Sequence, residues 1–138
     1  MLPNLLAKTD ARRAGAYEAW LIDEDGFVTE GTSTNAWIVD ASGRLTTRNL
    51  GHEILPGVTR RVIMEAAAEA QLPVSEHRFT PEDALVAREA FISSATGVVP
   101  VVSLDGKKIG EGRPGPVTRR VQELYAHRSA ARAAQLAR

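Results

Sequence analysis

Four short strand-type segments, separated by glycine-containing turns, precede one amphipathic helix, and this order restricts the possible folds of the chain. The strand-type segments are residues 17–23, 27–30, 35–40 and 44–48. Glu24-Asp25-Gly26 and Ala41-Ser42-Gly43 are typical of tight turns, so the segments on either side of each are expected to pair as hairpins. Residues 17–23 are aromatic and apolar on both alternating faces, which predicts a strand that is covered on two sides.

The rest of the chain mixes helices and strands without a regular repeat. After Pro56 and Gly57, apolar side chains between Val58 and Ala70 form one stripe of a helix, with Arg60, Arg61, Glu65 and Glu69 off the stripe. The other expected helices are residues 3–14, 81–87 with Thr80 as cap, and 116–134; the other expected strands are 74–79, 90–94, 98–104 and 107–109. This irregular succession predicts an α+β protein: a mixed, barrel-like β-sheet flanked by helices.

Composition excludes several classes of function. A chain of 138 residues is long enough for a single domain with a core. Lys plus Arg and Asp plus Glu both number 17, so no net positive field exists to bind nucleic acid or an anionic membrane. There is no cysteine, which excludes disulfides and thiolate metal sites and agrees with a cytoplasmic protein. No run of some 18 apolar residues predicts a membrane span, and the three histidines are too scattered to indicate a metal site.

The segment Leu55-Pro56-Gly57-Val58-Thr59-Arg60 has the properties of a phosphate-binding helix start. The first turn of a helix presents unpaired N–H groups and the positive end of the dipole, and the hydroxyl of Thr59 adds a donor. A plain junction of loop and helix has the same spacing, and on spacing alone it is the commoner interpretation.

Two further segments suggest polar binding groups. Glu30 ends a predicted strand before hydroxyl residues that include Ser33 and Thr34, and a carboxylate there can accept a hydrogen bond from a protonated pyridine nitrogen. The strand that ends at Ser94, followed by Ala95, can offer N–H and hydroxyl donors to a phosphate. The alternatives are a surface carboxylate beside a turn and an ordinary strand end.

Taken together, these segments resemble the class IV aminotransferases of fold type IV, the group of branched-chain and D-amino-acid transaminases. The resemblance covers about residues 1–125 and rests on segments 2–8, 15–21, 29–35, 54–60, 89–94 and 100–106. In their amino-acid sequence, residues 16–20 and 30–37 are most similar to the D-amino-acid transaminases. The resemblance implies the large C-terminal domain of the fold, pyridoxal 5'-phosphate as cofactor, an amino acid and a 2-oxo acid as substrates, and a homodimer.

The resemblance also implies roles for particular residues. Glu30 would pair with the pyridine nitrogen, and Val58 and Thr59 would bind the phosphate through N–H groups and the Thr59 hydroxyl. Ser94 and Ala95 would bind the phosphate from the other side, and Ser33 and Thr34 would lie near the cofactor. The chain is one residue shorter between Phe91 and Pro100 than the family pattern.

The lysine that attaches the cofactor is expected upstream of Met1. In the family it belongs to a pattern Lys-x-x-Asn-(Leu/Met)-Leu-Pro-Asn, and Met1-Leu2-Pro3-Asn4 lies inside that pattern. The three lysines present, Lys8, Lys107 and Lys108, are interpreted as surface charges. The chain is therefore expected to be a cofactor-binding domain without its small N-terminal domain, and to be inactive alone. Alternatives are a branched-chain aminotransferase, an aminodeoxychorismate lyase-like enzyme, or a non-catalytic domain of this fold.

Overall fold

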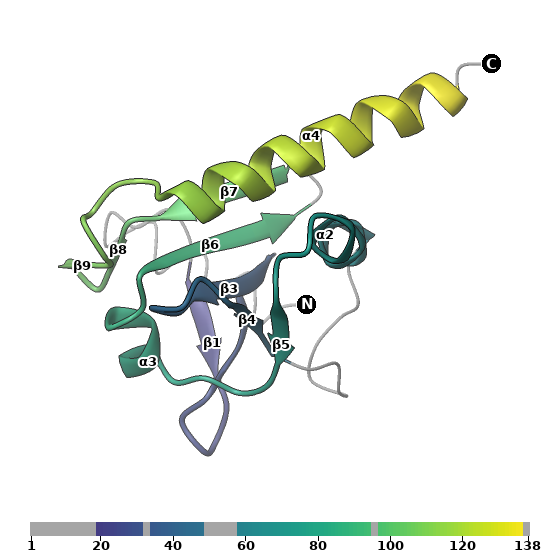
Figure 1. Ribbon diagram of the computed structural model, residues 1–138. Coiled ribbons are helices and arrows are strands. Elements are labelled where there is room, and N and C mark those ends of the chain that lie inside the picture. Colours follow the sequence, from purple (N-terminus) through teal and green to yellow (C-terminus); the bar gives the residue numbers. More distant parts are fainter. Residues whose placement is uncertain (1–18, 32–33, 49–57, 95–96, 137–138) are drawn as a thin grey trace.

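The computed structural model describes residues 19–31, 34–48, 58–94 and 97–136, which form a mixed sheet with helices packed on it (Figure 1). The strands are β1 (Trp20–Ile22), β2 (Val28–Gly31), β3 (Asn35–Val39), β4 (Leu45–Thr47), β5 (Val74–Glu76), β6 (Glu89–Ser94), β7 (Gly97–Val101), β8 (Ser103–Leu104) and β9 (Lys107–Lys108). The helices are α2 (Val58–Glu69), α3 (Pro81–Leu85) and α4 (Pro116–Leu136).

Five of the strands form the main sheet, in the order β5-β4-β3-β6-β7. β4 and β5 are parallel, and the other neighbours are antiparallel. Hairpins β1-β2 and β8-β9 are separate two-stranded sheets. The predicted α+β class, with a mixed sheet and flanking helices, is confirmed. Among the described strands the sheet is open, with β5 and β7 as its edges, and does not close into a barrel.

The core lies on both faces of the central strands because successive side chains of a strand point to opposite faces. Ala36 and Ile38 of β3 belong to a cluster with Val28 of the first hairpin and Ala84 of α3. Trp37 and Val39 belong to the cluster on the other face, beneath the helices; its buried members are Trp37, Val39, Leu45, Ile63, Phe91 and Val121. Trp37 stacks on Phe91, its partner in the ladder, at 5.4 Å between ring centroids.

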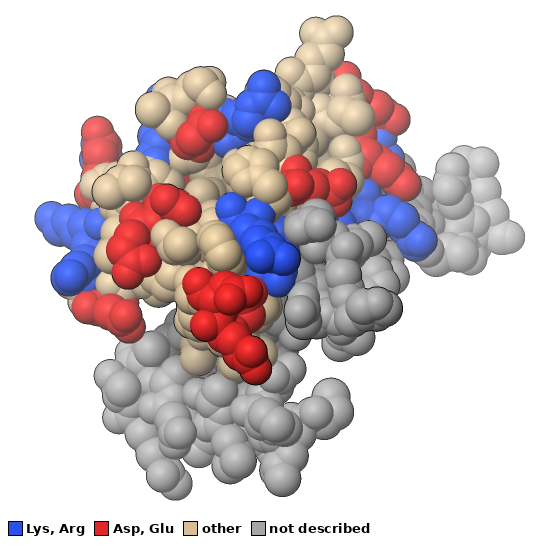
Figure 2. Space-filling model, turned by 90° about the horizontal axis from the view of Figure 1, so that it is seen from below, with Lys and Arg blue, Asp and Glu red and all other residues tan. Residues whose placement is uncertain are grey.

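Helices α2 and α4 cover the same face of the sheet (Figure 1). α4 runs along β7 and β6 and continues beyond the sheet toward the C-terminus. Arg128 of α4 forms ion pairs with Glu69 and Glu65 of α2, at 3.5 Å for Glu65. Charges of both signs are interspersed on the described part of the face in Figure 2, in agreement with the zero formal charge.

Three predicted elements differ from the structure in more than the exact position of an end. The described part of the first strand is short, and Ile22 is 47% exposed, so the expected cover on two sides is wrong there. β5 ends at Glu76 because Phe79 turns into the core, where it meets the ring of Trp20 edge to face. The predicted strand 98–104 is divided into β7 and β8, because β7 pairs with β6 and β8 pairs with β9. The predicted helix 3–14 lies outside the described residues.

A buried carboxylate fixes the start of α4 on the sheet. Glu89 of β6 is 5% exposed and accepts hydrogen bonds from the N–H groups of Val117 (3.1 Å) and Thr118 (2.7 Å). The carboxylate therefore caps the positive end of the helix dipole. Gly115 permits this approach, because a Cβ there would lie 2.2 Å from Cδ of Glu89.

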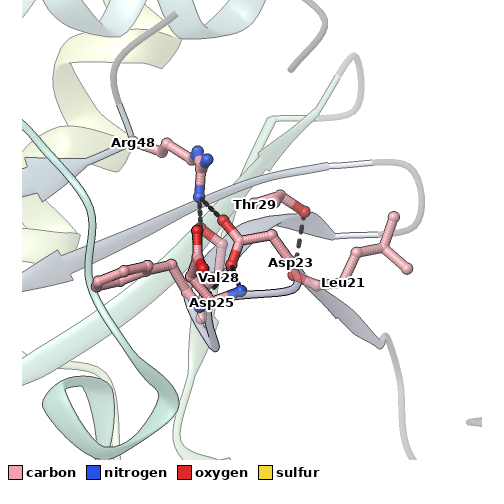
Figure 3. A network of polar contacts seen from close by, with 7 residues as sticks. Leu21, Asp23, Asp25, Val28, Thr29 and Arg48 are labelled. Atoms are coloured by element: carbon pink, nitrogen blue, oxygen red, sulfur yellow. Dashed lines mark hydrogen bonds and ion pairs between the residues drawn. The ribbon is translucent and has the colours of Figure 1, made fainter. Parts of the chain in front are cut away.

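The first hairpin is attached to the end of β4 through Arg48 (Figure 3). Arg48, which is 4% exposed, donates from Nη1 to the carboxylate of Asp23 at 2.8 Å and to the carbonyl oxygen of Val28 at 3.4 Å. The other carboxylate oxygen of Asp23 accepts from the N–H groups of Phe27 and Asp25. The Phe27 N–H, and after it the Arg48 guanidinium, hold the pKa of Asp23 below its ordinary value of 3.8.

Substituting Glu89→Gln is expected to lower the free energy of unfolding by about 1–2 kcal/mol, because the amide keeps the shape but loses the charge that faces the α4 dipole. Urea unfolding followed by circular dichroism measures this change. The control is Glu111→Gln, since Glu111 is exposed and, among the described residues, forms an ion pair only with the exposed Arg113; a change below about 0.5 kcal/mol is expected there. Equal losses for the two variants would contradict the capping role.

Substituting Asp23→Asn is expected to reduce the loss of stability in acid. The pKa of Asp23 is lowered in the folded chain, so the unfolded chain binds this proton more readily as the pH falls. The contribution of the charged carboxylate is therefore complete above the ordinary pKa of 3.8 and disappears as the pH falls through the lower, folded value. Urea midpoints between pH 2 and pH 7 should show a shallower acid decline for Asp23→Asn than for the control Asp105→Asn in an exposed turn.

Candidate functional site

The segments around Thr34, Thr59 and Ser94 meet at one end of the main sheet, which we call the Ser94 end. β6 ends here at Ser94, and its antiparallel neighbours β3 and β7 begin here at Asn35 and Gly97. β4 and β5 end here, because Thr47 pairs with Trp37 near the start of β3 and with Glu76 of β5. The mixed sheet thus brings together strand ends that lie far apart in the sequence.

The first turn of α2 lies at the Ser94 end and has a composition suited to an anion. α2 begins at Val58, and Thr59 in its first turn is 7% exposed. No acidic residue stands in this turn, which contains Arg60 and Arg61. The unpaired N–H groups of a helix start, a hydroxyl and the absence of a competing carboxylate in the turn form a donor set that fits a phosphate group.

Arg60 holds this first turn against the strand ends. The guanidinium is buried, with the residue 5% exposed, and Nη2 donates to the carbonyl oxygen of Arg48 (3.0 Å) and to Glu76 (2.7 Å). Its Nε has no hydrogen-bond partner among the described residues. Arg60 lies off the apolar stripe of α2, and such a position normally predicts a solvated charge. No pattern in the sequence therefore indicated its burial.

Tyr125 of α4 lies beside Thr59 and beside Gly97, the residue that pairs with Ser94. Its Oη lies 3.5 Å from Oγ1 of Thr59. Its ring carbon Cε2 lies 3.8 Å from the position that a Cβ on Gly97 would occupy, and Gly97 is the ladder partner of Ser94. The start of α2 and the end of β6 therefore flank one side chain. No motif in the sequence had indicated a role for Tyr125.

The remaining predicted residues are located as follows. Thr34 is half-buried just before β3, and Ser94 is half-buried at the end of β6. The backbone of Glu30 belongs to β2, but the direction of its side chain lies outside the described part. Ser33 and Ala95 also lie outside the described residues. Three residues of chain span at most about 11 Å, so the end of β2 at Gly31 lies within that distance of Thr34.

A cavity of about 500 Å³ lies at the opposite end of β6. Its lining residues are Arg88, Glu89, Gly110, Glu111, Arg113, Pro114, Gly115, Pro116 and Arg119. Arg88 lies beside Val39, because its N–H donates to the carbonyl oxygen at that end of β3. The cavity contains none of the predicted site residues and is distinct from the Ser94 end.

The lysines and histidines within the described residues are exposed. Lys107 and Lys108 form the exposed strand β9, and His77 and His127 are exposed as well. Among the described residues, no group of three metal-binding side chains is found. Within the same part of the chain, no helix has the length and apolarity needed to cross a membrane.

Comparison with known proteins identifies the family. Residues 1–104 match the family model of amino-transferase class IV. The D-alanine aminotransferase of Bacillus licheniformis is 42% identical over 123 residues, which are 88% of this chain and 43% of that enzyme. The branched-chain-amino-acid aminotransferase of Escherichia coli (strain K12) is 38% identical over 125 residues, 90% of this chain and 40% of that enzyme.

A solved structure of a branched-chain amino acid aminotransferase has the same fold over most of this chain. The T.th. branched-chain amino acid aminotransferase with pyridoxamine 5'-phosphate superposes with a TM-score of 0.86 at 34% identity, over 91% of this chain and 41% of that one. The chain thus spans 40% to 43% of the length of these three relatives. The family match, the sequence identities and the shared fold lead to one conclusion: the chain belongs to the class IV aminotransferase family.

Proposed function

We propose that the chain is the cofactor-binding domain of a pyridoxal-phosphate-dependent aminotransferase that transfers an amino group between an amino acid and a 2-oxo acid. This proposal rests on one observation: the first turn of α2, which contains no acidic residue, and the end of β6 both lie beside Tyr125. The chain in which they do so belongs to this family. The T.th. relative supports the cofactor, since the name of its structure includes pyridoxamine 5'-phosphate.

In this proposal the phosphate lies at the Ser94 end. The N–H groups of Val58 and Thr59 and the Thr59 hydroxyl donate to it, and Ser94 and Ala95 approach it from the side of β6. The buried Arg60 keeps the first turn of α2 fixed relative to β4 and β5. A rigid support of this kind keeps donors aimed at the phosphate without reorganisation on binding.

The pyridine ring of the cofactor is proposed to extend from the phosphate toward Glu30, whose carboxylate would meet the ring nitrogen. Ser33 and Thr34 are proposed to lie close by. A carboxylate that accepts a hydrogen bond from the ring nitrogen favours the protonated ring. When bound, the cofactor supplies an electron sink for the bond that is broken at the α-carbon of the substrate. The β1-β2 hairpin, which carries Glu30, is attached to the end of β4 by the Asp23–Arg48 ion pair. This attachment would hold the backbone at Glu30 in place.

The lysine that the reaction needs is proposed to belong to the longer protein, upstream of Met1, together with the small domain. Lys107 and Lys108 are exposed on β9, a strand of the separate β8-β9 hairpin. The described lysines therefore carry no role in the proposal. A homodimer and a cytoplasmic location remain predictions of the family resemblance.

We propose a D-amino acid as the amino donor, since the D-alanine aminotransferase of Bacillus licheniformis is 42% identical. A branched-chain amino acid is the second candidate, supported by enzymes of that name at 38% identity and by the solved structures. The longer protein, assayed with D-alanine and with L-leucine and a 2-oxo acid acceptor, separates the two. Transfer from neither donor would contradict the proposed activity.

Substituting Glu30→Gln in the longer protein is expected to lower kcat by roughly 100-fold while the cofactor stays bound, because an amide does not hold the ring nitrogen protonated. Steady-state kinetics and cofactor content measure the two quantities. Glu24→Gln is the matched control, since Glu24 is an exposed residue in the turn of the same hairpin. Unchanged turnover in Glu30→Gln would remove this residue from the site.

The 138-residue chain alone is expected to transfer no amino group. Borohydride should fix no cofactor to Lys8, Lys107 or Lys108, as peptide mass spectrometry would show. A reduced adduct on any of the three would contradict the proposal that the reactive lysine lies upstream.

A further inference from the structure

We propose that Tyr125 is a positioning residue for the cofactor phosphate: its hydroxyl donates to Thr59 and thereby turns the Thr59 hydroxyl hydrogen toward the phosphate. This inference rests on the proposed function, because it needs a phosphate at the start of α2. Tyr125 lies beyond the family match, which ends at Leu104, so the match assigns it nothing.

The position of Tyr125 is fixed by the way α4 packs. Val121, one turn earlier on the same face, is buried at 2% exposure among the core residues beneath the helices. Gln122 donates from Nε2 to the carbonyl oxygen of Val98 in β7 at 3.1 Å. The ring of Tyr125 packs against the same cluster as Val121. Its hydroxyl is therefore held near Thr59 by the contact of α4 with β7 and by the core.

The two hydroxyls, 3.5 Å apart, can be connected in either direction. Each has one hydrogen and two lone pairs. If Thr59 donates to Tyr125, its only hydrogen is used and it can only accept from other groups. If Tyr125 donates to Thr59, the Thr59 hydrogen is available for another acceptor. A phosphate at the start of α2 is a strong anionic acceptor, so its presence selects the second arrangement.

The arrangement also restricts the rotation of the Thr59 hydroxyl. A hydrogen bond that Tyr125 donates to Oγ1 occupies one lone pair, so the hydroxyl hydrogen of Thr59 points away from Tyr125. In this way Tyr125 lowers the cost of ordering the Thr59 hydroxyl when the phosphate binds.

The test measures binding of pyridoxal 5'-phosphate and of pyridoxal, which lacks the phosphate, to the 138-residue chain by equilibrium dialysis. The variants are Tyr125→Phe, Thr59→Val and the double substitution. Tyr125→Phe is expected to weaken pyridoxal 5'-phosphate binding about 3- to 10-fold, the effect of one hydrogen bond. Pyridoxal binding should not change. In the Thr59→Val background, the tyrosine substitution should have no further effect.

Two variants separate positioning from packing. Gln122→Met removes another contact of α4 with the sheet and is expected to lower stability without changing the preference for the phosphorylated ligand. Thr59→Ser keeps the hydroxyl and is expected to stay sensitive to Tyr125→Phe. Thermal unfolding of each variant verifies that it folds.

The outcomes distinguish this inference from the proposed function. If the unmodified chain binds pyridoxal as tightly as pyridoxal 5'-phosphate, the phosphate site itself is wrong, and the inference is overturned with it. If the chain prefers the phosphorylated ligand and Tyr125→Phe retains that preference in full, only the inference is overturned. The inference alone is also overturned if Tyr125→Phe weakens binding of pyridoxal 5'-phosphate equally in the unmodified chain and in the Thr59→Val background.

Discussion

The buried guanidinium of Arg60 is the constraint on which the geometry of the Ser94 end depends. A charge removed from water is tolerated only when partners compensate it. Here those partners are the carbonyl oxygen of Arg48 at the end of β4 and the carboxylate of Glu76 at the end of β5. The first turn of α2 therefore cannot shift along the sheet without leaving a buried charge unpaired. Thr59 directly precedes Arg60 in the chain, so the same contacts also fix the position of the Thr59 hydroxyl.

A second arginine extends the same constraint to the first hairpin. Arg48 offers its carbonyl oxygen to Arg60 and its guanidinium to Asp23, so α2, β4 and the β1-β2 hairpin are connected through one residue. The two ends proposed to hold one cofactor, Thr59 and the strand of Glu30, are thus linked by two arginine side chains. Both arginines are buried and need these partners, which favours a preformed site over one assembled on binding.

Local chemistry was sufficient to predict most of the elements from the sequence. Glycine-containing turns delimit β3 and β4, and the apolar stripe after Gly57 is the helix α2. The cap at Thr80 was found as well, with Asp83 completing a capping box. Glu89, Arg48 and Arg60 could not be recognised, because a charged residue in a sequence is ordinarily solvated. Their burial depends on partners that are distant in the chain, and no local pattern encodes such partners. Tyr125 could not be recognised for the same reason, because its hydroxyl contacts Thr59, which lies 66 positions away in the chain.

α4 connects the two ends of the sheet, and this explains why a tyrosine so late in the chain can reach the site. Glu89 holds the helix start beside the beginning of β6, and Gln122 binds β7 further along. Because β6 and α4 are both attached at Glu89, the helix follows the strand toward Ser94, and the rise per residue sets which side chain arrives there. The nine steps from Pro116 to Tyr125 span about 14 Å at roughly 1.5 Å each. The five steps from Glu89 to Ser94 span about 17 Å at roughly 3.4 Å each. These lengths are comparable, so a residue near position 125 is the one that meets the end of the strand.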